Sequence, residues 1–482
     1  MNRREFLKGT AWMGAAAFAA GCQLNRLGFG EGGQMQDYVY RKLMGRRIRV
    51  GFIGIGGRGT GAVHRVSMIP GVEIVALCDK LQARVDENLA WLKAQKYAGA
   101  DKIKTYVGEE AYKDLCDFGD CDVVYCATPW ALHQPVGLRG LLGGKIALIE
   151  VTSALTVDQC WELVEASEKF HVPCMQLENC VYGEIELLEL NLARMGMFGE
   201  ITHVEGAYIH DLRSIIPQTD PHNNEWEWRY GENMAHRGDR YPTHGLVPLC
   251  QTLGINRGDR LDYLVALGSG PHNKNYERVR KEYLPDTDSR KFDPPAALAD
   301  MNTTLLKTVN GVSIMVQHDV SSPRPYNRLA FISGTKGAMG DYPFRCTFEG
   351  KCMDGKTHEW FDAKKADEVR MKYMHPMWRD VSEMAKKVGG HGGMDFIMDL
   401  RWAWCLQNGE PLDMDVYDLA ATSCLCELTE TSDRSGSKPQ SIPDFTRGNW
   451  RNVKPWGVVN VDLKKMGLDK GGVKKDNAAL NV

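Results

Sequence analysis

The sequence of 482 residues has almost no net charge, since 59 lysines and arginines face 62 aspartates and glutamates. It therefore lacks the positive excess that favours binding to nucleic acids or to anionic membranes. It also lacks a long apolar run, because the Ala-rich stretch at 11–20 is far shorter than the roughly 20 residues that a membrane-spanning helix needs. We expect no nucleic-acid partner and no transmembrane helix.

No pair among the 14 cysteines has the two-residue spacer that zinc sites and redox pairs use. Cys424 and Cys426 are separated by one residue, and most of the others lie in apolar runs. A free cysteine in an apolar run behaves as a small hydrophobic residue. The sequence therefore predicts buried thiols, without disulfides and without a metal site.

A strand–glycine–helix pattern does stand out at 49–79. An apolar run ends in Gly54-x-Gly56-Gly57-Arg58-Gly59, a helix-compatible segment follows, and a second apolar run ends at Asp79. Gly54 permits a tight turn, Gly56 lets a pyrophosphate approach the backbone, and Gly59 allows close helix–strand packing. A carboxylate at Asp79 can bind an adenosine ribose and repels a 2′-phosphate. The pattern predicts an NAD site, although Arg58 in the loop weakens the preference over NADP slightly.

Alternating strand and helix patterns continue to residue 181. Thr128-Pro129-Trp130, Glu150-Val151 and Asn179 each follow an apolar strand pattern. Repeated strand–helix–strand units imply a doubly wound parallel sheet, in which ligands lie beyond the carboxyl ends of the strands. We therefore predict an α/β Rossmann domain at 47–181, with these residues lining one crevice.

The pattern changes beyond residue 181. Strand-like runs at 201–210, 260–267, 302–309, 312–318 and 327–333 are joined by turns, and Asn310-Gly311 is typical of a hairpin. This predicts an α+β domain at 182–456 with a mainly antiparallel open sheet, and a tail at 457–482. Late helices near 393–408 and 416–432 are expected to pack back on the first domain, and the polar segment 272–297 is expected to be a loop.

The amino terminus is typical of an export signal. Arg3-Arg4 precedes the short apolar run at 11–20, which ends at Gly21-Cys22. This predicts a twin-arginine signal at 1–22, followed by a linker at 23–46. Cys22 resembles a lipoprotein processing site, and simple cleavage without lipid is the alternative. The expected location is the periplasm, free or anchored to the membrane as a lipoprotein.

The sequence resembles glycoside hydrolase family 109, within the glucose–fructose oxidoreductase and inositol dehydrogenase superfamily. The resemblance covers about 46–456, and dehydrogenases of the superfamily usually carry Glu-Lys-Pro where this chain has Glu150-Val151-Thr152. The matching motifs are Thr128-Pro-Trp-x-x-His133, Glu178-Asn179-Cys180-x-Tyr182, Tyr208-x-His-Asp-Leu-Arg213, Tyr241-Pro-Thr-His-Gly-Leu246, Ile255-Asn-Arg-Gly-Asp-Arg-x-Asp-Tyr-Leu264, His391-Gly-Gly-Met-Asp395 and Pro443-Asp-Phe-Thr-Arg-Gly448.

The resemblance implies an NAD-dependent glycosidase acting on α-N-acetylgalactosaminides. Sugar C3 is oxidised for a time, a base removes the C2 proton, the aglycone is eliminated, water adds, and the carbon is reduced again. The resemblance assigns NAD contacts to Gly57, Arg58, Asp79, Trp130, His133, Glu150, Val151 and Asn179. It assigns sugar contacts to Tyr208, Arg229, Tyr241, Thr243, His244 and Tyr326.

Three of these residues are candidates for proton transfer. His244 suits the C3 hydroxyl because a neutral imidazole works near neutral pH. Tyr208 is the candidate for the C2 proton, and Tyr326 for stabilising the enolate or the leaving oxygen. The plainer interpretations are a helix-start hydrogen bond at His244 and cross-strand packing at Tyr208.

Two other functions stay open from the sequence. One is an exported sugar oxidoreductase with net hydride transfer, and the other is a carbohydrate-binding protein with a vestigial cofactor fold. No two-carboxylate arrangement of a conventional glycosidase is evident in the sequence. By analogy with the superfamily, we expect a homo-oligomer.

Overall fold

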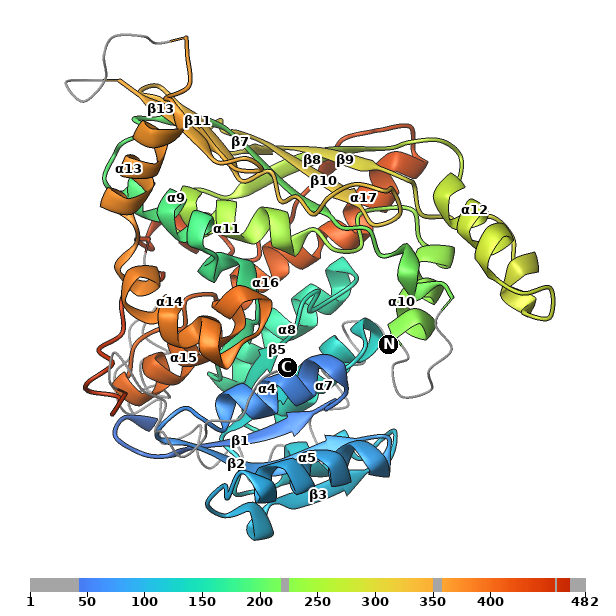
Figure 1. Ribbon diagram of the computed structural model, residues 1–482, viewed down its shortest axis with the longest axis vertical. Coiled ribbons are helices and arrows are strands. Elements are labelled where there is room, and N and C mark those ends of the chain that lie inside the picture. Colours follow the sequence, from blue (N-terminus) through green and yellow to red (C-terminus); the bar gives the residue numbers. More distant parts are fainter. Residues whose placement is uncertain (1–42, 218–224, 350–357, 456, 469–482) are drawn as a thin grey trace.

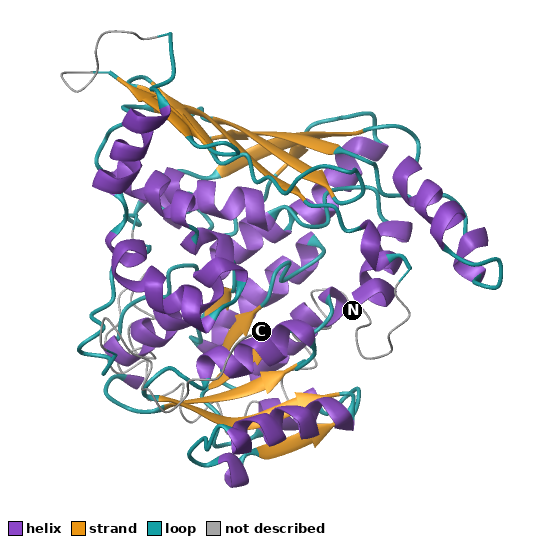
Figure 2. Cartoon of the chain, in the orientation of Figure 1, coloured by secondary structure: helices purple, strands orange, loops and turns teal. Residues whose placement is uncertain are grey.

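The computed structural model describes residues 43–217, 225–349, 358–455 and 457–468. The predicted export signal at 1–22 and all but the last residues of the predicted linker lie outside these residues, as does most of the tail. Two sheets stand at opposite ends of the molecule, with helices between them (Figures 1 and 2). None of the helices in the described ranges combines the length and the apolar character needed to cross a bilayer.

The first sheet is parallel throughout and has the strand order β3-β2-β1-β4-β5-β6. Its strands are β1 (Ile48–Ile53), β2 (Val72–Asp79), β3 (Lys104–Val107), β4 (Val123–Cys126), β5 (Ile146–Ile149) and β6 (Cys174–Gln176). The connecting helices are α4 (Gly57–Val66), α5 (Gln82–Ala94), α6 (Tyr112–Asp117), α7 (Trp130–Leu142) and α8 (Val157–Phe170). The order reverses between β1 and β4, which is where a doubly wound sheet opens its ligand crevice. The predicted fold class is confirmed.

The second sheet has the order β13-β12-β11-β7-β10-β9-β8-β14. Its strands are β7 (Ile201–Ile209), β8 (Leu261–Gly268), β9 (Asn302–Thr308), β10 (Ser313–Asp319), β11 (Phe331–Gly334), β12 (Gly337–Gly340), β13 (Arg345–Phe348) and β14 (Gln440–Ser441). The β7–β10 pair is parallel, and the other pairs are antiparallel. The β9–β10 hairpin turns at Asn310-Gly311, as the sequence predicts.

Helices cover one face of this second sheet, and the opposite face points outward (Figure 1). The helices of the carboxyl-terminal region are α9 (Glu184–Arg194), α10 (Glu225–Ala235), α11 (Thr243–Leu253), α12 (Lys274–Tyr283), α13 (Ala363–Tyr373), α14 (Pro376–Val388), α15 (Met394–Asn408), α16 (Val416–Ser423) and α17 (Leu425–Arg434). Among them, α11 contacts β7, α17 contacts β8, and α15 contacts α4 of the first domain.

The expectation of a loop at 272–297 is wrong. This segment contains α12, which Asn273 caps by accepting a hydrogen bond from the backbone N–H of Tyr276. Tyr276 and Val279 point to the core and are buried. The segment is rich in charged residues, so its sequence pattern did not reveal that Tyr276 and Val279 are both buried. These residues are three positions apart, which places them on one face of a helix.

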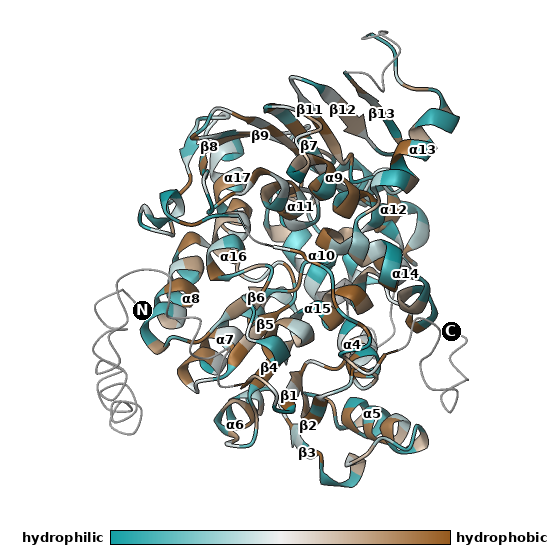
Figure 3. Ribbon diagram, turned by 90° about the vertical axis from the view of Figure 1, so that its left-hand side faces the viewer, coloured by the Kyte–Doolittle hydropathy of each residue, from teal (hydrophilic) through white to brown (hydrophobic). Residues whose placement is uncertain are grey.

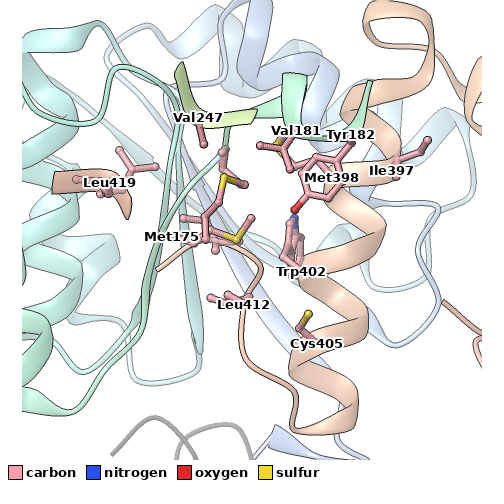
Figure 4. Packing of buried hydrophobic residues seen from close by; sticks show 14 of the residues in the cluster. Met175, Val181, Tyr182, Val247, Ile397, Met398, Trp402, Cys405, Leu412 and Leu419 are labelled. Carbon is pink, nitrogen blue, oxygen red and sulfur yellow. The ribbon is translucent and has the colours of Figure 1, made fainter. Parts of the chain in front are cut away.

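The core continues from one domain to the other. Met175 of β6, Val247 of α11, Trp402 of α15 and Leu419 of α16 belong to one buried cluster (Figure 4). Hydrophilic residues predominate on the outer helix α13, whereas hydrophobic residues follow the strands (Figure 3). Every cysteine in the described residues is a free, buried thiol, which confirms that part of the cysteine prediction.

Candidate active site

The glycine loop between β1 and α4 has the geometry that its sequence predicts. Gly54 has a φ of +79°. A Cβ atom on Gly59 would lie 1.9 Å from the carbonyl oxygen of Gly54, so only glycine lets the helix start this close to the strand. A Cβ on Gly56 or Gly57 would meet nothing within 4 Å. The loop is therefore tight towards the protein and open towards the crevice, as a site for a pyrophosphate requires.

Asp79 ends β2 beside this loop. Its carboxylate accepts hydrogen bonds from the backbone N–H groups of Ile55 and Leu81, at 2.9 and 3.0 Å. These contacts fix the acid at the edge of the crevice, where a ribose of the bound cofactor would lie. The loop and the acid together fit NAD.

Arg58, the second residue of α4, joins the loop to the rest of the crevice. Its Nε lies 2.6 Å from Glu150 Oε1, and its Nη1 lies 2.5 Å from Asp395 Oδ2. Asn179 donates to the other oxygen of Asp395 at 2.6 Å. Two residues predicted to bind NAD, Arg58 and Asn179, therefore contact one buried carboxylate of α15, and a third, Glu150, contacts Arg58. Asp395 belongs to a matching motif but was not among the predicted site residues.

The charge of Asp395 depends on these partners. Burial alone would raise the pKa of this carboxyl, but Arg58, His391 and Arg65 hold it well below its usual range. Arg65, two turns after Arg58 on α4, also donates to Asp399 at 2.8 Å. Two arginines of the cofactor helix are thus paired with two aspartates of α15, and this pairing fixes the second domain against the nucleotide-binding loop.

Trp130 and His133, both predicted NAD contacts, lie on the first turns of α7 and are 3 % and 2 % exposed. The two ring nitrogens of His133 contact the backbone carbonyl oxygens of Thr152 and Thr128 at 2.7 and 2.6 Å. Burial lowers the pKa of His133 to about 4. This side chain therefore ties together the loops after β4 and β5. Trp130 donates to the carbonyl oxygen of Val151 at 3.3 Å.

A contact between two glycines positions the candidate catalytic residues. A Cβ on Gly206 of β7 would lie 2.1 Å from the carbonyl oxygen of Gly245 of α11, so strand and helix touch backbone to backbone. Tyr208 and His244, close to these glycines in sequence, consequently face each other with ring centroids 5.1 Å apart in a T-shaped arrangement. Tyr241 completes the group, with its ring centroid 4.7 Å from each of the other two.

Glu178, which the site prediction missed, is the hydrogen-bond partner of His244. Its Oε1 lies 2.8 Å from His244 Nδ1, and the carboxylate has no exposed surface. Burial opposes its ionisation, but the charge and hydrogen bond of His244 outweigh this effect, so the pKa of Glu178 is lowered. Glu178 follows β6 next to Asn179. Glu178 lies at the end of a strand, as Asn179 does, so its position in the sequence was a signal for a site residue.

Arg229 of α10 is held among aromatic rings. Its guanidinium carbon lies 4.8 Å from the ring centroid of Trp130, 4.9 Å from that of Trp228 and 5.5 Å from that of Tyr241. Trp130 and Tyr241 in turn stack at 5.6 Å. The residues predicted for the cofactor and those predicted for the sugar therefore meet at Trp130.

Tyr326 lies beside Tyr208, with ring centroids 6.4 Å apart. It is 37 % exposed, and its hydroxyl accepts a hydrogen bond from Arg328 Nη1 at 3.0 Å. Arg328 is itself held by Glu186 at 2.7 Å. Partial burial raises the pKa of Tyr326, which favours the protonated phenol. Thr243, at the start of α11, is buried beside His244.

The ligand atoms of Glu178, Cys180 and His244 all lie within 4.8 Å of one another, a grouping that the cysteine spacing did not predict. Burial raises the pKa of the Cys180 thiol well above its ordinary value, which disfavours the thiolate that a metal would bind. Glu178 and His244 are engaged with each other. The chemistry of this set fits a hydrogen-bonded acid–base pair better than it fits a cation.

Comparison with known proteins supports an NAD-binding Rossmann fold. Residues 48–177 match a family model described as an oxidoreductase family with an NAD-binding Rossmann fold. Among solved structures, a levoglucosan dehydrogenase in complex with NADH and levoglucosan superposes with a TM-score of 0.61 at 16 % identity, over 82 % of this chain and all of that one. An aldose–aldose oxidoreductase from Caulobacter crescentus gives a TM-score of 0.57 at 16 % identity, over 82 % of this chain and 100 % of that one. These structures share the fold.

Proteins related in sequence identify the family. A glycosyl hydrolase family 109 protein from Bacteroides thetaiotaomicron is 46 % identical over 424 residues, which cover 84 % of this chain and 86 % of that protein. Another, from a Shewanella species, is 41 % identical over 469 residues, or 95 % and 99 % of the two chains. Residues 182–452 match the model of the glycosyl hydrolase 109 carboxyl-terminal domain. The chain is an NAD-using enzyme, and it belongs to glycosyl hydrolase family 109.

Proposed function

We propose that this enzyme hydrolyses α-N-acetylgalactosaminides through temporary oxidation of the sugar at C3. The observation that carries the proposal is the buried Glu178–His244 pair, which faces Tyr208 next to the stacked rings of Tyr241 and Trp130. Bound NAD supplies a reversible hydride acceptor for a sugar carbon. The glycine loop, Asp79 and Arg58 would hold it.

His244 moves the proton of the C3 hydroxyl in this proposal. The carboxylate of Glu178 accepts the Nδ1 hydrogen, so that Nε2 keeps a lone pair for the substrate. Dehydrogenases of the superfamily have a lysine for this task, but here the corresponding position is Val151, which has no proton to transfer. The His–Glu pair takes over that role.

Tyr208 and Tyr326 serve the elimination. A C3 ketone acidifies the C2 hydrogen, and Tyr208 removes it. The electron pair of the C2–H bond then forms a C1–C2 double bond as the glycosidic C1–O bond breaks. Tyr326, which keeps its proton and is oriented by Arg328, donates to the leaving oxygen. Water adds at C1, and Tyr208 returns a proton to C2.

Hydrolysis of α- and β-linked N-acetylgalactosaminides and galactosides in deuterated water tests the proposal. We expect release of the aglycone from the α-N-acetylgalactosaminide, deuterium at C2 of the product, and no net accumulation of NADH. An oxidised sugar with stoichiometric NADH would instead establish the alternative, an oxidoreductase with net hydride transfer. Sugar binding without any turnover would establish a carbohydrate-binding protein.

We also propose export by the twin-arginine route, on the basis of Arg3-Arg4, the apolar run at 11–20 and Cys22. This route carries proteins that have already folded, which suits a chain that must enclose its cofactor first. Cell fractionation of the full chain and of a variant with both arginines changed to lysine tests this. Retention of the variant in the cytoplasm supports the proposal, and unchanged export contradicts it.

A further inference from the structure

His210 follows the last residue of β7 and lies between the phenols of Tyr208 and Tyr326. Its Nδ1 is 3.0 Å from the hydroxyl oxygen of Tyr208. Its ring packs edge-on against the ring of Tyr326, with centroids 5.1 Å apart. His210 has no role in the proposed mechanism so far, although it is hydrogen-bonded to the predicted C2 base, Tyr208.

The position of His210 is fixed by the backbone. Its N–H donates to the carbonyl oxygen of Asp319, the last residue of β10, at 2.9 Å. The side chain is intermediate in exposure, between Tyr208 at 7 % and Tyr326 at 37 %. His210 therefore lies between the buried Tyr208 and the more exposed Tyr326, where it can pass a proton from Tyr208 towards solvent.

The surroundings favour the neutral imidazole. Burial lowers the pKa of His210, the nearby cations reinforce this effect, and Asp211 opposes it weakly. A neutral ring with its hydrogen on Nε2 has an unshared pair at Nδ1, which can accept the Tyr208 proton. The groups that face it from the packed elements are Tyr208 of β7, Arg229 of α10, His244 of α11, Tyr326 after β10, His391 before α15 and Asp211 of its own segment.

We propose that His210 accepts the phenolic proton of Tyr208 and releases it to solvent, so that Tyr208 can act as the base at C2. The Tyr208 O–H bond breaks, a bond forms from that proton to His210 Nδ1, and the Nε2 proton leaves to water. Tyr208 is left as a phenolate that then takes the C2 proton. This inference rests on the proposed function, because only the elimination step gives the phenolate a proton to remove.

The relay has a consequence that a packing role would not have. After Tyr208 has taken the C2 proton, transfer through His210 exchanges it with solvent before it is returned. Without the relay, Tyr208 would hold the original proton and return it. The isotope found at C2 of the product therefore reports on His210 separately from the rate.

The test compares the full enzyme with H210Q, in which an amide oxygen can still accept a hydrogen bond from Tyr208 but cannot carry a proton. The matched control is H203Q, because His203 lies on the same strand and its Nδ1 is hydrogen-bonded to the Ser313 hydroxyl at 2.8 Å. Each variant is assayed in deuterated water, with and without added imidazole, and the wild type is also assayed with a substrate deuterated at C2.

We expect H210Q to lose about 100-fold in kcat, a typical contribution of one proton-transfer group. Its product should retain hydrogen at C2, imidazole should restore rate and exchange together, and H203Q should match the wild type. If H210Q shows wild-type rate and wild-type deuterium content, the relay is wrong. The relay is also wrong if the wild type shows a C2 isotope effect but no exchange. A wild type with neither an isotope effect nor exchange would instead refute the elimination, and with it the proposed function.

Discussion

Oε1 of Glu178 lies 2.8 Å from Nδ1 of His244, although 66 residues separate the two in the chain. The carboxylate is fully buried at the end of β6, and the imidazole sits on the first turn of α11. A buried acid in this position selects one tautomer of the ring and stabilises the imidazolium that forms when the ring accepts a proton. The pair therefore decides which nitrogen of His244 is available to a substrate.

Replacing Glu178 with glutamine should reduce kcat about 100-fold or more with little change in KM, because the tautomer of His244 is no longer fixed. The measurement is steady-state hydrolysis of an aryl α-N-acetylgalactosaminide. The chain offers a matched control in His236 and Glu430, which form a second His–Glu pair at 2.8 Å. E430Q should leave kcat unchanged. Equal losses in both variants would show a general effect on folding.

Two substitutions in the glycine loop should separate protein stability from NAD affinity. In G59A the new Cβ would overlap the Gly54 carbonyl oxygen, so we expect a loss of stability of about 1–3 kcal/mol or more. In G56A the Cβ meets no protein atom, so the melting temperature should stay the same while NAD affinity falls at least tenfold, or about 1.4 kcal/mol. G119A, where the space is also open, is the control for both measurements. Unchanged NAD binding in G56A would place the pyrophosphate elsewhere.

Replacing Asp395 with asparagine should release the cofactor helix. The variant should lose bound NAD during dialysis and should be less stable by about 3–5 kcal/mol, as expected when one partner of a buried ion pair is removed. D122N, which breaks the Arg49–Asp122 pair near the other end of β1, is the control that should keep its NAD. NAD retained by D395N to the same degree as by D122N would contradict the role of this contact.

The same variant has a defined pH dependence. The folded-state pKa of Asp395 lies below the ordinary 3.8, so its contribution to stability is complete above that value and is lost as the pH falls through it towards the folded-state pKa. The difference in unfolding free energy between the wild type and D395N should be constant from about pH 7 to 5 and shrink below about pH 4. Urea unfolding at a series of pH values measures this. A difference that grows on acidification would have the wrong sign.

Tyr326→Phe separates two roles for this phenol. If it donates to the leaving oxygen, alkyl glycosides should lose about 100-fold in kcat, whereas nitrophenyl glycosides, whose leaving group needs no proton, should lose little. If it stabilises the enolate instead, the two losses should be equal. Stability should hardly change, because the side chain is 37 % exposed. Y417F, which removes a phenol hydrogen-bonded to Glu168 outside the candidate site, is the control.

The cofactor half of the site could be predicted because its parts are local. Gly54, Gly56, Gly59 and Asp79 are spaced along one strand–helix–strand unit, and the structure has the tight turn, the close helix–strand packing and the open side of the loop that this spacing predicts. Their contacts with NAD stay predictions. One edge strand of the first sheet, β3, could not be predicted from the sequence. Strand β3 is mostly exposed and has no apolar run, so its pattern did not indicate a strand.

The remaining partners of the site were hidden because they are distant in sequence. Glu178 meets His244 across 66 residues of chain, and Asp395 meets Arg58 across 337 residues through the packing of α15 on α4. His210 differs, because it contacts Tyr208 only two residues earlier and meets the distant Tyr326 only in the fold. A single sequence shows the residue types but not which buried carboxylate meets which cation. The site assignments that came from the family resemblance stay predictions until the variants are measured.

The pairing of α4 with α15 also bears on how far the chain can be divided. A fragment ending before residue 395 would keep Arg58 and Arg65 but lack both aspartates and the helix α15 that packs on α4, so this face of α4 would be exposed to water. The nucleotide-binding half would lose its buried ion pairs and its packing together, so it should not be stable as an excised module. Premature termination anywhere upstream should therefore yield a degraded product, not a smaller protein that still binds dinucleotide.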